Sequence, residues 1–116
     1  MKHEEMLEQI DYIFGEVKRI HTAGQKEYAM NEDNVFANFE RISEQTGFDR
    51  KMVLWIYLMK HIDGIVAHIN GHESQREDIR GRIKDSIVYL TLYWAMVEGE
   101  MGVKWEQMGG KIYHTY

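Results

Sequence analysis

The segment KEYAMNEDNVFANFE, residues 26–40, places aromatic rings beside amide and cationic side chains. Phe36 and Phe39 flank Asn38, and Lys26 lies upstream. Plain connectors between helices use mainly Gly, Ser, Asp and Asn, and seldom place aromatic rings next to groups with free donors and acceptors. The composition favours a segment that binds a ligand, with a simple connector as the alternative.

Two carboxylates interrupt the apolar stripes of the two longest expected helices. On a helical wheel, Asp63 falls within the stripe of residues 52–69, and Asp85 borders the stripe of residues 79–97. We expect both to open on one polar pocket between antiparallel helices, with Lys60 at its edge. An acid in an apolar seam needs a cation, a hydrogen-bond donor or a metal ion. Ordinary pairing with Lys60, an arginine or a tyrosine hydroxyl is the alternative to a functional site.

Three further groups of polar residues have a structural alternative. His61, His68 and His72 share a helical face, and the last two have the spacing of zinc ligands, but that face lies opposite the apolar stripe. We therefore predict a solvated face there. Glu77 fits a capping box with Ser74. The remaining cations align near one helix start, where phosphate binding and ordinary ion pairing are both open; they are Arg76, Arg80 and Lys84.

The apolar periodicity predicts the elements that must position these residues. It indicates helices over 6–20 (ending near Gly24 or continuing to Ala29), 35–45, 52–69 and 79–97. Gly47 and Gly71 are expected stops, and Asp49 is an expected cap. The fold class is therefore all-α, a helical bundle with two long antiparallel helices plus a short helix. Around Gly109 the pattern changes to that of an extended arm or small hairpin.

The 116 residues form a single domain, 1–116, with the bundle in 1–101 and the arm in 102–116. The sequence has no cysteine, which excludes disulfides and thiolate metal sites. A net charge of −5 argues against a direct grip on DNA or RNA. With no apolar run near 18 residues and no signal segment, we expect no membrane insertion and a cytoplasmic location.

The run IVYLTLYWAMV, residues 87–97, is apolar nearly all round its helix. A single buried face would cover only half of it. Self-association into a homo-oligomer is one explanation, and a central helix wrapped by the rest of the chain is the other.

Polar and aromatic residues of the 26–40 segment and of the two long helices together resemble the pattern of a known family. They occur in the order Lys26, Tyr28, Asp33, Phe36, Asn38, Phe39, Lys60, Glu77, Asp85 and Tyr89. This order resembles small helical phage and prophage proteins called nucleotide-modification-associated, which are related distantly to MazG-like all-α nucleoside triphosphate pyrophosphohydrolases. The resemblance covers residues 20–97, and its most specific parts are DNVFANF and the Glu77-x7-Asp85-x3-Tyr89 pattern. It implies an all-α, often oligomeric fold that holds a nucleotide between residues 26–40 and the two long helices.

The resemblance also implies roles for individual residues. Lys26 and Tyr28 would contact phosphate, Asn38 would read a polar edge of the ligand, and Tyr89 would join the binding set. Phe36 or Phe39 would stack on the base, a contact worth about 1–3 kcal/mol. The alternative is that these two rings pin the short helix to the core.

The catalytic acids of the MazG-like enzymes are matched only in part. Those enzymes hold Mg²⁺ with E-x-x-E and E-x-x-D on facing helices. Here these spacings occur only within Glu5–Asp11, on the polar side of the first helix. Glu77 and Asp85 lie two turns apart, and Asp63 stands where the relatives carry a basic residue.

Three functional hypotheses follow. In the first, the chain is a magnesium-dependent nucleotide pyrophosphohydrolase with Asp63, Asp85 and Glu77 on the metal and Lys60 on phosphate; Asp63 and Asp85 are its catalytic residues. In the second, it is a sponge that sequesters a nucleotide-derived defence signal in the host cytoplasm, with its pocket at a subunit interface. In the third, it is a helical interaction protein without a ligand. Because the binding residues are better matched than the metal ligands, we favour nucleotide binding.

Overall fold

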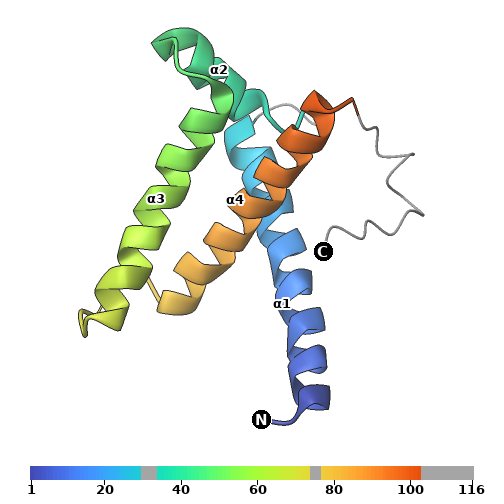
Figure 1. The fold of residues 1–116 in the computed structure, drawn as a ribbon, viewed down its shortest axis with the longest axis vertical. Helices are drawn as coiled ribbons and strands as arrows, with labels where there is room; N and C mark the ends of the chain where they lie inside the picture. The colour runs from blue at the N-terminus through green and yellow to red at the C-terminus, as the bar shows by residue number, and fades with distance from the viewer. Residues whose placement is uncertain (30–33, 74–76, 103–116) are drawn as a thin grey trace.

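The computed structural model describes residues 1–29, 34–73 and 77–102. Along the chain the elements are α1 (His3–Gly24), the π-helix η1 (Gln25–Ala29), α2 (Ala37–Thr46), α3 (Arg50–Ile69) and α4 (Ile79–Glu100) (Figure 1). In the described part of the chain the regular elements are all helices, so the predicted all-α class is confirmed. The predicted C-terminal arm lies outside the described residues from residue 103 onward.

Several predicted helix ends are confirmed by their local geometry. Asp49 caps α3, because its Oδ1 accepts from the backbone N–H of Lys51 at 2.7 Å. Gly47 follows α2 with φ +80°, and Gly71 follows α3 with φ +88°, both in the left-handed region that favours glycine. The aspartate cap and the two glycine stops therefore act at these helix ends as the sequence predicted.

The cap that was predicted for α4, the Ser74–Glu77 capping box, is wrong. The helix begins at Ile79, and its cap is Asp78, whose Oδ1 accepts from the backbone N–H of Arg80 at 2.8 Å. Arg80 also binds both carboxylate oxygens of Asp78, which holds the pKa of Asp78 far below its usual value. Ser74 lies outside the described residues. Asp78 is therefore the residue that satisfies the first backbone N–H groups of α4.

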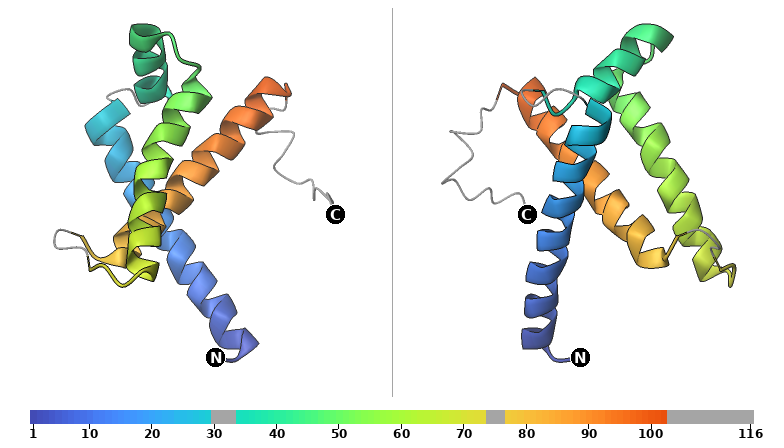
Figure 2. Two further views of the ribbon diagram at one scale, coloured as in Figure 1. Left: turned by 60° about the vertical axis from the view of Figure 1, so that its left-hand side comes forward. Right: turned by 180° about the vertical axis from the view of Figure 1, so that it is seen from behind.

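The helices form a bundle from which the N-terminal half of α1 projects (Figure 2). α3 and α4 run antiparallel, joined at one end by residues 70–78, and α2 lies at the other end (Figure 1). α1 packs against α4, while its N-terminal half extends beyond the other helices in both views of Figure 2. The bundle therefore has a third long helix in addition to the predicted antiparallel pair.

The core lies where α2, α3 and α4 meet. Leu54 of α3 and Met96 of α4 are 1% and 0% exposed, and Phe39 and Val53 complete the buried cluster. Five half-buried apolar or aromatic side chains pack around it: Phe36, Ile42, Tyr57, Tyr89 and Leu92. The predicted short helix is therefore anchored to both long helices by Phe39.

The apolar stripe that was expected to face the core on α3 faces outward. Its members are between 42% and 74% exposed; they are Met52, Ile56, Met59, Val66 and Ile69. Asp63, which lies in this stripe, is also exposed, so the expectation that it faces the core or a cavity is wrong. The buried face of α3 is instead that of Val53, Leu54 and Leu58. Because both faces are apolar, periodicity alone could not tell which one is covered.

On α4 the predicted apolar stripe of residues 79–97 is covered only in part. Two of its members, Leu90 and Trp94, are 52% and 58% exposed, whereas Val88 and Met96 are buried. Asp85 lies on the covered side, with Tyr89. Asp85 therefore lines a cavity, as expected, although the buried face of α4 differs in part from the predicted one.

One described helix, α3, is long and apolar enough to cross a membrane by length and composition. Its mean hydropathy is 1.3, and 17% of the relevant window is buried inside the structure. The core helices of many proteins pass the same test, so this property only marks α3 as unusually apolar.

Leu54 provides a test of the core. Leu54→Ala should lower the free energy of unfolding by about 2–5 kcal/mol, because it leaves a cavity where α2, α3 and α4 meet. Leu7→Ala, at a side chain that is 49% exposed on the projecting half of α1, is the matched control and should have a much smaller effect. Urea denaturation followed by circular dichroism measures both. Equal losses would place the core elsewhere.

Candidate functional site

A cavity of about 680 Å³ lies between α1, η1, α2, α3 and α4. Its aromatic lining is Phe39, Tyr57 and Tyr89, and its polar lining is Arg19, His21, Gln25, Glu27, Asn38, Lys60, His61 and Asp85. Each of the elements contributes at least one of these residues. The cavity therefore exists only in the folded bundle.

Three stacked or edge-packed rings form one wall of the cavity. Tyr57 and Tyr89 are stacked with ring centroids 6.3 Å apart and planes 7° from parallel. Phe39 meets each of them edge-on, at 6.1 and 6.3 Å. Since Phe39 belongs to the buried core, the core holds both tyrosine rings in place.

Asp85, Glu77 and His61 form a cluster beside the cavity. Its Oδ2 lies 3.7 Å from Nδ1 of His61, whose ring is 5.5 Å from that of Tyr89. Burial raises the pKa of Asp85; the nearby charge of His61 opposes this rise, and the charge of Glu77 and a hydrogen bond with Glu77 add to it. Two of the three predicted acids, Glu77 and Asp85, are therefore brought together.

Gly81 explains how Glu77 reaches Asp85. A Cβ atom built on Gly81 would lie 2.9 Å from Oε1 of Glu77 and 3.3 Å from its Cγ. The Glu77 side chain thus lies across the first turn of α4, over the space that any other residue would fill. Any residue with a Cβ atom at position 81 would therefore make the Glu77 side chain move from this place.

Side chains within residues 34–50 fix the position of the start of α2. Glu40 accepts from Asn34 Nδ2 at 2.8 Å and from Arg50 Nη1 at 3.1 Å. The guanidinium of Arg50 lies over the ring of Phe36, 4.8 Å from its centroid. The Gln25 amide donates to the Asn34 carbonyl oxygen at 3.2 Å, tying η1 to this segment. These contacts therefore fix α2 against α3 and η1.

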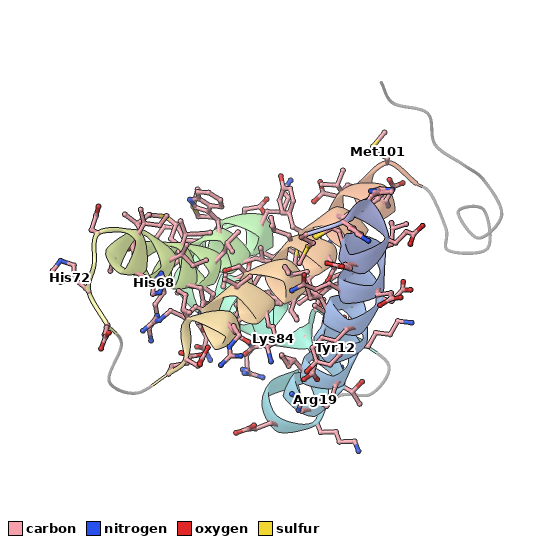
Figure 3. The ribbon with its side chains drawn as sticks, turned by 90° about the horizontal axis from the view of Figure 1, so that it is seen from below. Tyr12, Arg19, His68, His72, Lys84 and Met101 are labelled. Carbon is pink, nitrogen blue, oxygen red and sulfur yellow. The ribbon has the colours of Figure 1, made fainter. Side chains whose placement is uncertain are left out.

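Glu16 connects α1 to α4 beside the cavity. Its carboxylate accepts from Arg19 at 2.6 Å and from Tyr12 at 3.3 Å, and it lies 3.7 Å from Lys84 Nζ. Figure 3 shows Tyr12, Arg19 and Lys84 on the side where the two helices meet. The hydrogen bond from Arg19 keeps the pKa of Glu16 below its usual value. This ion-pair network positions Arg19 at the cavity.

The structure brings together about half of the predicted site residues. Five line the cavity: Asn38, Phe39, Lys60, Asp85 and Tyr89. Glu77 does not line the cavity but forms a hydrogen bond with Asp85, and three other predicted residues are placed apart from it.

Asp63 is exposed on the outer face of α3, Lys26 is exposed and does not line the cavity, and Phe36 packs under Arg50. The side chain of Tyr28 lies outside the described part of the structure.

His61 is the main residue that the sequence reasoning placed wrongly. It was assigned to a solvated face, but its side chain is 17% exposed and lies beside Asp85. The spacing of Leu54, Leu58, His61 and Ile65 would have shown it, since these positions share the buried face of α3. Tyr57 and Arg19 were not predicted either, because nothing in the sequence distinguishes them from core and surface residues.

The other predicted cationic and histidine groups are placed as follows. His68 is exposed near the end of α3, and His72 is exposed beyond it (Figure 3). Arg80 pairs with Asp78 and Lys84 with Glu16, so ion pairing accounts for both. Arg76 lies outside the described residues. Over residues 1–29, 34–73 and 77–102, no three His, Asp or Glu side chains gather closely enough to hold a metal ion by themselves.

Comparison with known proteins does not extend these observations. No family, no curated protein and no solved structure matches the chain.

Asp85→Asn tests the effect of the half-buried carboxylate on stability. Because the pKa of Asp85 is raised in the folded protein, its ionised form destabilises the folded state at any pH above that pKa. The substitution should therefore raise Tm at pH 7. The gain should shrink as pH falls through the raised pKa and vanish below the ordinary aspartate pKa of 3.8, where Asp85 is protonated in both states.

Thermal unfolding across this pH range measures the effect of Asp85→Asn. Asp11→Asn, at an exposed position on α1, is the matched control and should show no such trend. A stabilisation that did not change with pH would contradict the assignment.

Gly81→Ala tests the contact between Glu77 and Asp85. Alanine favours helix over glycine by about 1 kcal/mol, but its Cβ would displace the Glu77 side chain. The pKa of Asp85, followed by NMR titration of its carboxyl carbon, should therefore fall toward its ordinary value. Gly99→Ala in the same helix, where a Cβ meets nothing within 4 Å, should leave that pKa unchanged. Equal behaviour of the two variants would show that Glu77 does not act on Asp85.

Proposed function

We propose that the protein binds a nucleotide or a nucleotide-derived small molecule in the cavity between its helices. The observation that carries the proposal is that an aromatic wall and two cationic side chains line one cavity. Tyr57 and Tyr89 provide the rings, and Lys60 and Arg19 provide the charge. A nucleotide combines a planar base with phosphate, which matches both halves of this lining.

The size and charge of the cavity support this class of ligand. About 680 Å³ falls within the roughly 300–1,000 Å³ typical of small-molecule sites. Two cationic side chains, Arg19 and Lys60, and two carboxylates, Glu27 and Asp85, line the cavity. The cations offer contacts for the phosphate of a small ligand, whereas the net charge of −5 for the whole chain argues against a grip on a nucleic-acid strand.

Asn38 supplies a further polar contact. Its Oδ1 accepts from Nη2 of Arg41 at 2.8 Å, which fixes the orientation of the amide. The NH₂ group then points away from Arg41, and Asn38 lines the cavity. An amide held this way can donate to a base or ribose oxygen.

Hydrolysis of the bound nucleotide is the second candidate function. The observation in its favour is the pairing of Glu77 with Asp85 next to His61. Two neighbouring carboxylates suit Mg²⁺, which commonly takes one or two protein carboxylates plus phosphate oxygens and water. When bound, the ion would neutralise charge on the phosphate. Glu77 and Asp85 would be the ligands, whereas Asp63 lies on the outer face of α3.

Incubation with a panel of nucleotides decides between binding and turnover. The purified protein is incubated with Mg²⁺ and nucleoside triphosphates, deoxynucleotides or cyclic nucleotides, and both the bound and free fractions are analysed by mass spectrometry. We expect one class of nucleotide to be retained unchanged. Conversion to a monophosphate would favour the hydrolase, and neither retention nor conversion would contradict nucleotide binding.

Lys60→Ala tests where the retained ligand binds. Loss of a charge-assisted hydrogen bond to phosphate costs about 1.5–3 kcal/mol, so Kd measured by calorimetry should rise by about tenfold or more. Lys18→Ala removes the same charge from an exposed position of α1 outside the cavity and should leave Kd nearly unchanged. Equal effects of the two substitutions would place the ligand elsewhere.

A further inference from the structure

The outer face of α3 carries an uncovered row of apolar side chains at heptad spacing. The row consists of Met52, Trp55, Met59, Ile62, Val66 and Ile69, which are 49%, 49%, 42%, 38%, 49% and 74% exposed. We call these six residues the α3 seam. Their spacings are 3, 4, 3, 4 and 3, the a/d pattern by which two helices pack side by side. We propose that the α3 seam docks against the α3 seam of a second copy of this chain, with the two helices antiparallel.

The area of the seam is that of a protein interface. The six seam residues and the neighbouring Ile56, which is 51% exposed, each leave on the order of 100 Å² uncovered, or on the order of 700 Å² together. This exceeds the roughly 300–600 Å² of the largest apolar patch on a typical monomer. It is close to the roughly 800 Å² that each partner covers in a standard interface.

The pattern of the seam is self-complementary under a two-fold axis. The series 3, 4, 3, 4, 3 reads the same in both directions, so an antiparallel copy matches it over its whole length. In such a pair Met59 faces Ile62 of the other copy, Trp55 faces Val66, and Met52 faces Ile69. Homodimers most often use such isologous contacts, in which one patch meets itself.

A groove at one end of the seam fits the residues at the other end. It has a volume of about 350 Å³ and lies between α3 and α4; its lining includes Met52, Trp55, Leu90 and Tyr93. Ile69, the most exposed residue of the seam, would insert there from the second copy. The opposite ends of the seam therefore supply a protruding side chain and an apolar recess.

The two charges beside the seam favour the antiparallel arrangement. Asp63 lies directly beside the seam near its middle, and the exposed Lys60 lies one turn before it on the same side, between the seam and the cavity that it also lines. In an antiparallel pair, like flanks meet, so Asp63 comes beside Lys60 of the other copy and each chain forms the same ion pair. In a parallel pair, Asp63 would instead lie beside apolar Leu58 or Ile65 of the other copy.

The same two charges favour a protein over a lipid bilayer as the occupant. α3 is long and apolar enough to cross a membrane, but Lys60 and Asp63 would then lie near the bilayer centre. A charged side chain at that depth costs about 2.5–3.5 kcal/mol. A second copy offers each of them an opposite charge.

Measurement of the molar mass tests the dimer. Light scattering after size exclusion should give twice the 13.8 kDa of the chain, or an even multiple of it, for the wild type. Met59→Glu with Ile62→Glu should give 13.8 kDa, because four carboxylates would meet at the centre of the seam. Leu7→Glu with Phe14→Glu, at α1 side chains that are 49% and 48% exposed, should keep the wild-type mass. A wild type at 13.8 kDa, or a seam variant with unchanged mass, would overturn the proposal.

Exchange of the two charges tests the antiparallel orientation and does not depend on an apolar substitution. The dimer Kd is measured without nucleotide, because Lys60 also lines the cavity. Lys60→Glu or Asp63→Lys alone places like charges together and should raise this Kd by about tenfold, while the double variant should restore it. The double variant behaving as the sum of the singles would overturn the orientation. Circular dichroism confirms that each variant is folded, and if Met59→Glu with Ile62→Glu is not, the charge exchange decides. Flotation of a monomeric wild type with phosphatidylcholine and phosphatidylglycerol vesicles would overturn the proposal in favour of a bilayer.

Discussion

The packing of Leu54 on Met96 is the contact on which the rest of the structure depends. These two side chains join α3 to α4, and Phe39 brings α2 onto them. Because Phe39 also touches Tyr57 and Tyr89, the same contact sets the aromatic wall of the cavity. The core is small, with few fully buried side chains, so any shift of α2 would move the cavity wall as well. The position of the site and the stability of the fold therefore rest on the same atoms.

Asp85 carries a cost that packing does not explain. Its burial beside Glu77 disfavours the charged form, and His61 offsets this only in part, at 3.7 Å. A hydrophobic residue would pack in the same place without that cost. Groups held in this way concentrate at functional sites. The aromatic wall, the cations of α1 and α3, and this acid lie around one space, which supports our proposal that they act on one ligand.

The sequence predicted the helices and their ends better than the direction in which they face. Asp49 and Gly47 marked the ends of α3 and α2 because capping and left-handed turns are local properties of a few residues. Of the site, Asn38, Phe39, Lys60, Asp85 and Tyr89 were predicted and do line the cavity. His61 was placed on the wrong face and Asp63 was expected in the pocket. Both errors come from the choice of the buried stripe on α3.

The sequence by itself determined that the chain forms long amphipathic or fully apolar helices, because local propensity, caps and stops depend on neighbouring residues. Only the tertiary structure decided which face of α3 and α4 is covered. Both faces of these helices are apolar, so their burial depends on which neighbours are present and not on any local signal. The face of Leu54 is covered by the chain itself, and the face of Met59 is left exposed. Because the face of Leu54 is the covered one, His61 lies beside Asp85 and Asp63 is exposed on the outer face of α3.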